Sequence, residues 1–240
     1  MTTSLAAAAA KLVHPDGGKV ASHQRMIHHM DEGIGQVMGA LHRQGLLDDT
    51  LIDFTGDNGG ERFSDNWPLV GGKMGLTEEG IRVPWLAHWP RQVPAGSVSH
   101  RHCMTMDWST TLLEVGGGQT RPYFRPNGDS LLGVLKDPST RFERPMLWRM
   151  RQRQQGATRW GRWKYLKADE HEYLFDITAD ARERANLAQR GAERLVTLRY
   201  AWLAWDASMP PNPAAATVSL GLSVKDMPQR QVSGDDLEPW

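Results

Sequence analysis

Two oxygen-bearing side chains stand together in a glycine-rich segment, Asp57-Asn58-Gly59-Gly60. A carboxylate and an amide carbonyl are hard oxygen ligands, which suit Ca²⁺ or Mg²⁺ rather than a soft metal. The glycines after them allow the backbone to turn sharply and to approach a ligand closely. An ordinary turn has the same composition, because Asp, Asn and Gly all favour turns for local reasons. The segment alone therefore leaves both a metal loop and a simple turn open.

A lysine surrounded by glycines follows a little further along, in Gly71-Gly72-Lys73-Met74-Gly75. No neighbouring side chain is large enough to shield its ammonium group fully, which suits contact with a fixed oxyanion such as sulfate or phosphate. The segment is not a nucleotide-binding P-loop, because neither Ser nor Thr follows the lysine. A solvated lysine in a flexible loop is the alternative.

The elements around these loops are those of an open α/β sheet. Apolar residues recur at three- and four-residue steps over residues 26–41, which predicts an amphipathic helix. The apolar and β-branched run at residues 50–55 predicts a strand that ends just before Asp57, and residues 83–89 predict a second strand. Ligands of such sheets bind at the carboxyl ends of strands. Asp57 and Asn58 fall at such an end.

The sequence changes character beyond residue 137. A helix over residues 108–115, capped by Asp107, precedes the change. Short aromatic-rich runs then predict a small antiparallel sheet over residues 146–151, 157–160, 163–166 and 172–175, followed by a helix over residues 192–205. We therefore predict part of an α/β core at 1–136, an antiparallel subdomain with a packing helix at 137–208, and an extended or disordered tail at 209–240.

Composition excludes several classes of protein. Lys and Arg number 28 and Asp and Glu number 28, so the zero net charge argues against a nucleic-acid or anionic-membrane partner. A single cysteine, Cys103, excludes an internal disulfide framework and a cysteine-rich zinc site. No signal peptide is visible, which would leave the chain as it stands in the cytoplasm, whereas a full-length relative could be periplasmic. The compartment stays unknown at this stage.

Residues 50–90, TLIDFTGDNGGERFSDNWPLVGGKMGLTEEGIRVPWLAHWP, resemble the sulfatase family. That family carries a strand ending in DNG, then GGK, then an EGG-I-R-V-P segment leading into a strand closed by W-P. The segments MDWSTTLLEVGG, NGDSLLGVLK and RWGRWKYLKADEHEYLFDITADARERANLA are similar to later family segments. The resemblance covers residues 22–204 and is closest to bacterial arylsulfatase-like members. It implies the C-terminal part of an alkaline-phosphatase-like fold.

The resemblance also implies roles for four residues. Asp57 and Asn58 match the second pair of ligands to Ca²⁺ (or Mg²⁺), and Lys73 matches the lysine that contacts the sulfate group. His14 is the candidate for the family's leaving-group histidine, although a proline and a glycine pair follow it at shortened spacing. Glu79 stands where the family usually has glycine, where it could crowd the site or change its polarity.

Other features depart from the family. The C/S-x-P-x-R segment, whose Cys or Ser becomes the formylglycine nucleophile, does not occur in the sequence, and neither does the first pair of Asp ligands. Cys103 lacks the following proline and arginine, so no catalytic residue is assigned. Two oxygen ligands fall short of the roughly 6–8 that Ca²⁺ prefers, so metal binding should be weak.

These features favour one function and leave two alternatives. The favoured reading is a sulfuric ester hydrolase that lacks the half carrying the nucleophile, and is therefore inactive as an isolated chain. One alternative is a non-catalytic fragment or pseudoenzyme that acts by binding. The other is a phosphoesterase of the same superfamily, disfavoured because those enzymes have D-H-G where this chain has Asp57-Asn58-Gly59. The partners expected are a sulfate ester and either a second copy of the chain or a missing N-terminal half.

Overall fold

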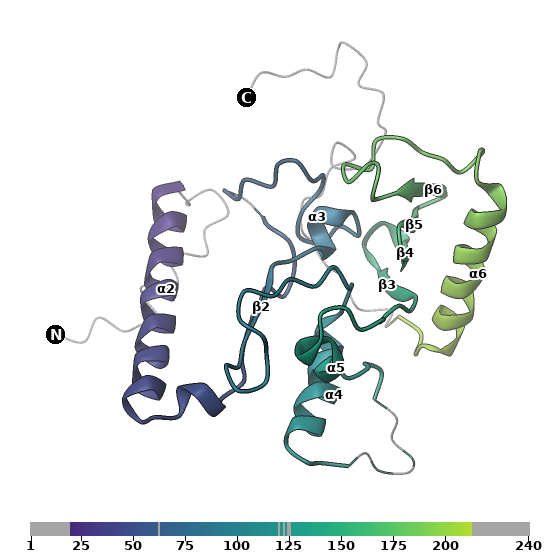
Figure 1. Cartoon of the computed structure of the whole chain (residues 1–240). Helices are drawn as coiled ribbons and strands as arrows, with labels where there is room; N and C mark the ends of the chain where they lie inside the picture. Colours follow the sequence, from purple (N-terminus) through teal and green to yellow (C-terminus); the bar gives the residue numbers. More distant parts are fainter. Residues whose placement is uncertain (1–19, 62, 120, 122, 124–125, 213–240) are drawn as a thin grey trace.

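The computed structural model describes residues 20–61, 63–119, 121, 123 and 126–212. A long helix, α2 (Val20–Arg43), forms one edge of the molecule (Figure 1). It confirms the helix predicted over residues 26–41 and is longer at both ends. None of its 24 residues is buried, although its sequence is amphipathic. A turn with Gly45 at φ 67° and the short 3₁₀ helix η1 (Leu47–Asp49) lead from it into the first strand.

Two strands frame the glycine-rich loops. Strand β1 (Ile52–Thr55) pairs antiparallel with β2 (Trp85–His88), with Ile52 opposite His88 and Thr55 opposite Trp85. Both strands lie where the sequence predicted them. The connection between them holds the DNGG and GGK segments and the short helix α3 (Glu78–Ile81). Asp57 therefore lies just beyond the end of β1, as predicted, with Gly56 between them.

A pair of helices packs next to this sheet. Helix α4 (Thr105–Val115) begins before Asp107, so the prediction that Asp107 precedes the helix is wrong by a few residues. The reason is that Asp107 caps the helix from within its first turn, because its carboxylate accepts the backbone N–H of Met104 at 2.7 Å. Trp108 of α4 packs with Leu131 and Leu135. Leu131 immediately precedes helix α5 (Leu132–Lys136), and Leu135 lies within it.

The C-terminal part is a four-stranded antiparallel sheet in the order β3-β4-β5-β6, as the aromatic-rich runs predicted. Its strands are β3 (Met146–Met150), β4 (Gln155–Trp160), β5 (Trp163–Ala168) and β6 (His171–Asp176), with a 3₁₀ turn η2 (Gln152–Gln154) after β3. Gly161, at φ 56°, turns the chain between the facing pair Trp160 and Trp163. Such a φ suits glycine because it has no Cβ.

Helix α6 (Ala192–Ser208) covers one face of this sheet (Figure 1). Leu195, Leu198 and Trp202 form a core cluster with Tyr165 and Leu174 of the sheet. This helix confirms the one predicted over residues 192–205. The division into a core, a subdomain and a tail stays a prediction, and most of the predicted tail lies outside the described residues. No described helix has the length and apolar character needed to cross a membrane.

Candidate functional site

The two glycine-rich segments after β1 and the short helix α3 meet in the structure. The Gly59 N–H donates to the Gly80 carbonyl at 3.0 Å, and the Gly60 N–H donates to Glu79 Oε1 at 3.1 Å. From the other side, the Lys73 N–H donates to the Gly60 carbonyl at 2.8 Å. The loop that carries Asp57 and Asn58 is therefore held between the GGK segment and α3.

These contacts explain why glycines are needed here. A Cβ on Gly59 would lie 1.5 Å from the Glu79 carbonyl oxygen, and one on Gly80 would lie 2.0 Å from the Gly75 carbonyl oxygen. A Cβ on Gly72 would lie 2.7 Å from the Gly60 carbonyl oxygen. Backbone atoms cannot move aside as a flexible side chain can. The glycines thus permit close backbone packing, which a simple exposed turn does not require.

Asp57 and Asn58 lie side by side at the end of β1 with oxygen atoms available. Asp57 is exposed, and its carboxylate forms no hydrogen bond or ion pair with any residue that the structure describes. Asn58 is half-buried and its Nδ2 donates to the Gly59 carbonyl at 2.9 Å, which commits the amide nitrogen and leaves the carbonyl oxygen for another contact. The pair fits part of a hard-cation donor set. Among the described residues, no three His, Cys, Asp or Glu side chains are grouped as metal ligands.

Lys73 is joined to this loop through its backbone, and its ammonium group faces an acidic side chain. Lys73 Nζ lies 3.8 Å from Glu61 Oε2, and both side chains are partly exposed. Exposed ion pairs of this kind contribute little, about 0–1 kcal/mol. An anion with more than one oxygen can therefore displace Glu61 from Lys73 at low cost. His14, the other residue predicted to contact substrate, lies outside the described residues.

Glu79 has a role that sequence reasoning missed. Its side chain is buried, and its carboxylate accepts the Gly60 N–H that lies two residues beyond Asn58. The glutamate at this position, where the sulfatase pattern has glycine, thus braces the loop from behind. The departure from glycine was the available signal, but the sequence could not show toward which loop the side chain turns.

A buried ionic network connects α3 to the C-terminal sheet. Glu78 accepts from Arg159 Nη1 at 2.9 Å and from Lys164 Nζ at 3.1 Å, and Lys164 Nζ lies 2.8 Å from Glu183 Oε1. Glu183 Oε2 also accepts the Glu78 backbone N–H at 2.6 Å. Two carboxylates and two cations compensate one another, as buried charges require. Because Glu78 precedes Glu79 and Gly80, this network fixes the segment on which the Asp57 loop rests.

The network shifts the titration of its members. Burial alone would raise the pKa of Glu78, but Lys164 and Arg159 together outweigh burial and lower it. Burial, with the Glu78 charge nearby, raises the pKa of Glu183 despite Lys164. His102, whose Nε2 lies 3.0 Å from Arg159 Nη2, has a lowered pKa because of its burial and of the Arg159 charge, so it is neutral at pH 7.

Cys103 has the environment of a structural thiol. It packs against the core cluster around Trp108, and burial raises the pKa of its thiol to about 11. A nucleophilic cysteine needs a lowered pKa, because the thiolate is the reactive form. This environment agrees with the sequence argument that Cys103 is not a nucleophile.

Comparison with known proteins identifies the fold first. The structure matches the crystal structure of Ps i-CgsB with a TM-score of 0.68 and 28% sequence identity. The match covers 75% of this chain and 41% of the Ps i-CgsB chain. The structure also matches the phosphonate monoester hydrolase of Agrobacterium radiobacter over 73% of this chain and 38% of the other, with a TM-score of 0.53 and 26% identity. The fold is therefore that of the alkaline-phosphatase-like superfamily.

Sequence comparison then shows a similarity to one family. The sequence model of the family named Sulfatase matches residues 4–118. The steryl-sulfatase of Mus musculus is 32% identical over 144 residues, which cover 56% of this chain and 23% of that protein. The chain is thus similar to sulfatases over about half of its length, and it spans about a quarter of the length of this curated relative.

Proposed function

We propose that this chain carries the metal loop and the sulfate-binding lysine of a sulfate-ester hydrolase. The observation that supports this most is the packing of the Asp57–Asn58 loop between the GGK segment and α3. Gly60 accepts a hydrogen bond from Lys73 and donates one to Glu79, so one residue joins all three segments. A site that must hold charges within a fraction of an ångström needs such rigid support.

The chemistry of each residue suits a sulfate ester. Asp57 and the carbonyl oxygen of Asn58 would hold a Ca²⁺ or Mg²⁺ ion, which supplies positive charge to the sulfate oxygens when bound. Lys73 would approach the same group after leaving Glu61, and so would stabilise the charge that develops as the ester S–O bond breaks. Glu79 would hold the loop in place without contacting the sulfate ester, because its carboxylate accepts the Gly60 N–H.

We further propose that these 240 residues do not turn over sulfate esters by themselves. They contain no C/S-x-P-x-R segment, and the thiol of Cys103 is protonated at neutral pH. Without an attacking group, only electrostatic and binding contributions to catalysis remain. We expect no saturable hydrolysis of 4-nitrophenyl sulfate by the purified chain with 5 mM CaCl₂, on the order of the concentration that weak Ca²⁺ sites need. Turnover that persists through purification and disappears in Cys103→Ala would show that the nucleophile was misassigned.

Metal binding provides a second test that does not depend on turnover. We expect CaCl₂ to shift the backbone amide NMR signals of Gly59 and Gly60 with millimolar affinity, since only two protein ligands are present. Asp57→Ala should weaken this binding at least about tenfold, which is the low end of what losing a metal-site residue costs. Asp48→Ala removes an equally exposed carboxylate outside the loop and is the matched control. Equal losses in both variants would mean that Ca²⁺ binds through general charge, not at this loop.

A phosphoesterase is the second candidate function, and one structural match supports it. The phosphonate monoester hydrolase match extends over most of this chain, and the metal loop and lysine would serve a phosphoryl group equally well. Asn58 argues against it, because the two-metal phosphoesterases have a histidine at this position for their zinc. Competition for the Lys73 site separates the two: inorganic sulfate should shift the Lys73 signals at lower concentration than phosphate does if the proposal is correct.

A further inference from the structure

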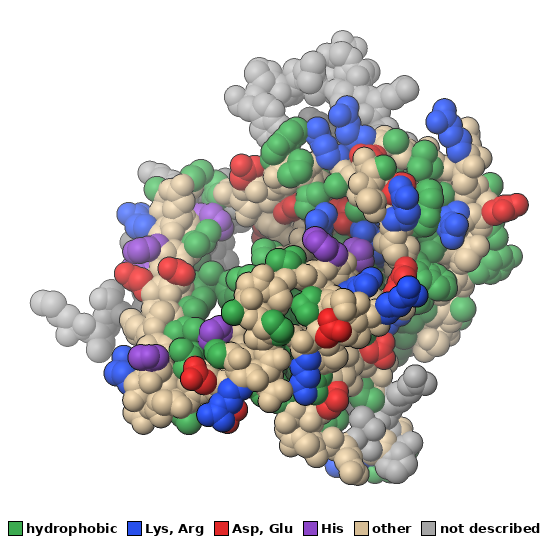
Figure 2. Space-filling model, viewed as in Figure 1, with side chains coloured by type: hydrophobic (Ala, Val, Ile, Leu, Met, Phe, Trp, Pro, Cys, Tyr) green, Lys and Arg blue, Asp and Glu red, His purple; other side chains and the backbone are tan. Residues whose placement is uncertain are grey.

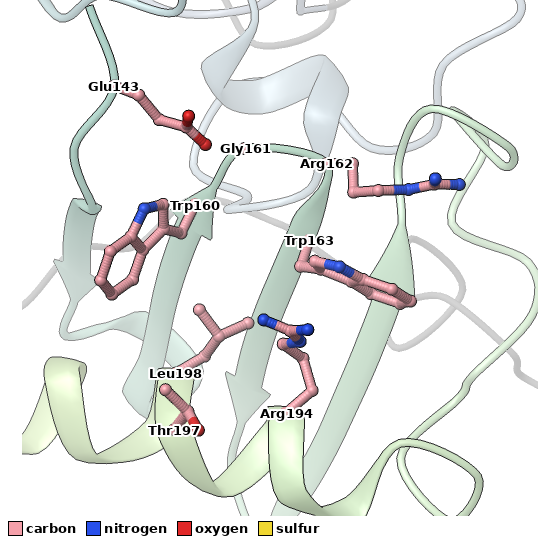
Figure 3. Close-up of a pocket in the computed structure, with 8 residues that line it drawn as sticks. All are labelled: Glu143, Trp160, Gly161, Arg162, Trp163, Arg194, Thr197 and Leu198. Atoms are coloured by element: carbon pink, nitrogen blue, oxygen red, sulfur yellow. The ribbon is translucent and has the colours of Figure 1, made fainter.

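A pocket of about 280 Å³ lies between the β4–β5 hairpin and helix α6, away from the loops described above (Figure 3). The indoles of Trp160 and Trp163 stand on opposite sides of it, and the Arg194 side chain rises from α6 between them (Figure 3). Glu143 borders the pocket beside Gly161. None of these residues belongs to the Asp57 loop, the GGK segment or α3.

Arg194 gives the pocket its available positive charge. Its guanidinium lies 5.6 Å from the centre of the Trp163 ring, and Arg162 lies 5.7 Å from the same ring. Arg162 already pairs with Asp176, whereas no carboxylate of the described residues forms an ion pair with Arg194. A guanidinium within about 6 Å of an indole ring can be attracted to the ring face while its planar fork of N–H donors still binds a ligand. Such a fork binds the oxygens of a sulfate or carboxylate group.

The rest of the pocket suits a polar ring with an apolar face. Trp160 is 42% exposed, so the pocket is lined by an indole that the protein itself leaves uncovered. The flat C–H face of a pyranose packs well against an indole, while its hydroxyl groups need hydrogen-bond acceptors. The Glu143 carboxylate supplies such an acceptor, and its charge would direct an anionic substituent away toward Arg194.

The pocket is built on rigid elements. Trp160 and Trp163 face each other across the hairpin, and Arg159 Nε donates to the Gly161 carbonyl at 2.8 Å. Arg159 is in turn held by the buried carboxylate of Glu78. Leu198, which is fully buried, lies at the base of the pocket on α6. Binding residues held in place in this way lose little entropy when a ligand binds.

We propose that this pocket binds one anionic pyranose unit of a sulfated saccharide. Its volume is at the small end of ligand sites, which span about 300–1,000 Å³, and so suits a single ring rather than an oligomer. The anionic group lies on Arg194, the ring stacks on Trp160, and hydroxyl groups donate to Glu143. The inference is independent of the proposed hydrolase function, because it uses neither the metal loop nor Lys73.

The test is a titration of the full chain with a heparin tetrasaccharide in a buffer of about physiological ionic strength, where long-range attraction is screened. We expect saturable binding by calorimetry, with shifts of the Trp160 and Trp163 indole N–H signals in NMR spectra. The desulfated, N-acetylated tetrasaccharide should bind at least about tenfold more weakly, because hydrogen bonds to charged groups are the strong ones. Arg194→Ala and Trp160→Ala should each reduce affinity for the sulfated probe by about the same factor.

Arg190→Ala is the matched control, because Arg190 is an exposed arginine just before α6 that does not line the pocket. It should change affinity less than about twofold, as expected for an exposed charge that makes no contact with the ligand. Arg194→Lys keeps the charge without the planar fork, so its affinity should lie between those of the parent and Arg194→Ala. The melting temperature of every variant should equal that of the parent. Equal losses for Arg190→Ala and Arg194→Ala, equal binding of the desulfated probe, unshifted indole signals, or no binding would each overturn the proposal.

Discussion

Replacing Lys164 with methionine should lower the free energy of unfolding by about 3–5 kcal/mol at pH 7.5, the cost of breaking a buried ion pair. Lys164 is fully buried and lies between the carboxylates of Glu78 and Glu183. Methionine fills a similar volume, so the loss comes from two buried carboxylates that lose their shared cation. Urea unfolding followed by circular dichroism measures it. A loss this large would unfold many domains, because their total stability is about 5–15 kcal/mol.

The pH dependence of this loss separates charge from packing. Lys164 lowers the pKa of both carboxyl groups, so its removal raises both pKa values in the folded state. When the pKa of a carboxyl group is higher in the folded protein than in the unfolded one, the group adds stability at pH values below its pKa in the unfolded protein. That stability is lost as the pH rises through its pKa in the folded protein. The difference between Lys164→Met and the parent should therefore shrink as pH falls toward about 4.5, the ordinary value for glutamate. A difference that is constant with pH would indicate a packing defect instead.

Two further variants provide the controls. Lys167→Met changes a lysine on the same strand outside the network and should cost less than about 0.5 kcal/mol. Adding Glu183→Gln to Lys164→Met should restore part of the stability, because Glu78 would keep Arg159 as its partner. The glutamine carbonyl can still accept the Glu78 N–H that Glu183 accepts now. If the double variant is less stable than Lys164→Met, Lys164 does not act through Glu183.

Local patterns predicted most of the secondary structure. Helix α2 follows from the three- and four-residue recurrence of apolar residues, and the β4–β5 hairpin follows from Gly161 between two aromatic-rich runs. These signals are local, because helix periodicity and turn chemistry depend on residues close in sequence. The start of α4 was misplaced for a local reason as well, since Asp107 caps the helix from its first turn instead of from the position before it.

The support of the candidate site could not be predicted in this way. Asp57, Asn58 and Lys73 were recognisable from their segments, but the brace from Glu79 to Gly60 joins residues 19 apart and has no periodic signal. The Glu78 network joins residues up to 105 apart, and a buried lysine such as Lys164 runs against the usual exposure of its type. Contacts of this kind depend on the folded arrangement of two sheets, which a single sequence does not reveal.

Helix α2 should make the chain associate with itself. Its apolar side chains are exposed, with Met26 57%, Met30 50% and Val37 61% accessible, and Ile27 and Ile34 lie on the same stripe. Figure 2 shows hydrophobic side chains at the surface in the region of α2. An exposed apolar stripe of this kind often marks an interface. Residues three and four apart share one face of a helix, so a second copy of α2 offers a matching stripe.

We expect the sedimentation coefficient of the chain to rise between about 1 and 100 µM, the range in which modest protein–protein affinities lie. Met30→Glu with Val37→Glu places two charges in the stripe and should leave a monomer across this range, with less binding of a hydrophobic dye. Gln24→Glu with Gln36→Glu adds the same two charges away from the stripe and should associate as the parent does. A parent chain that stays monomeric, binds no dye and melts at high temperature would show that the exposed face of α2 is not an interface, and that the chain is self-sufficient without a partner for this helix.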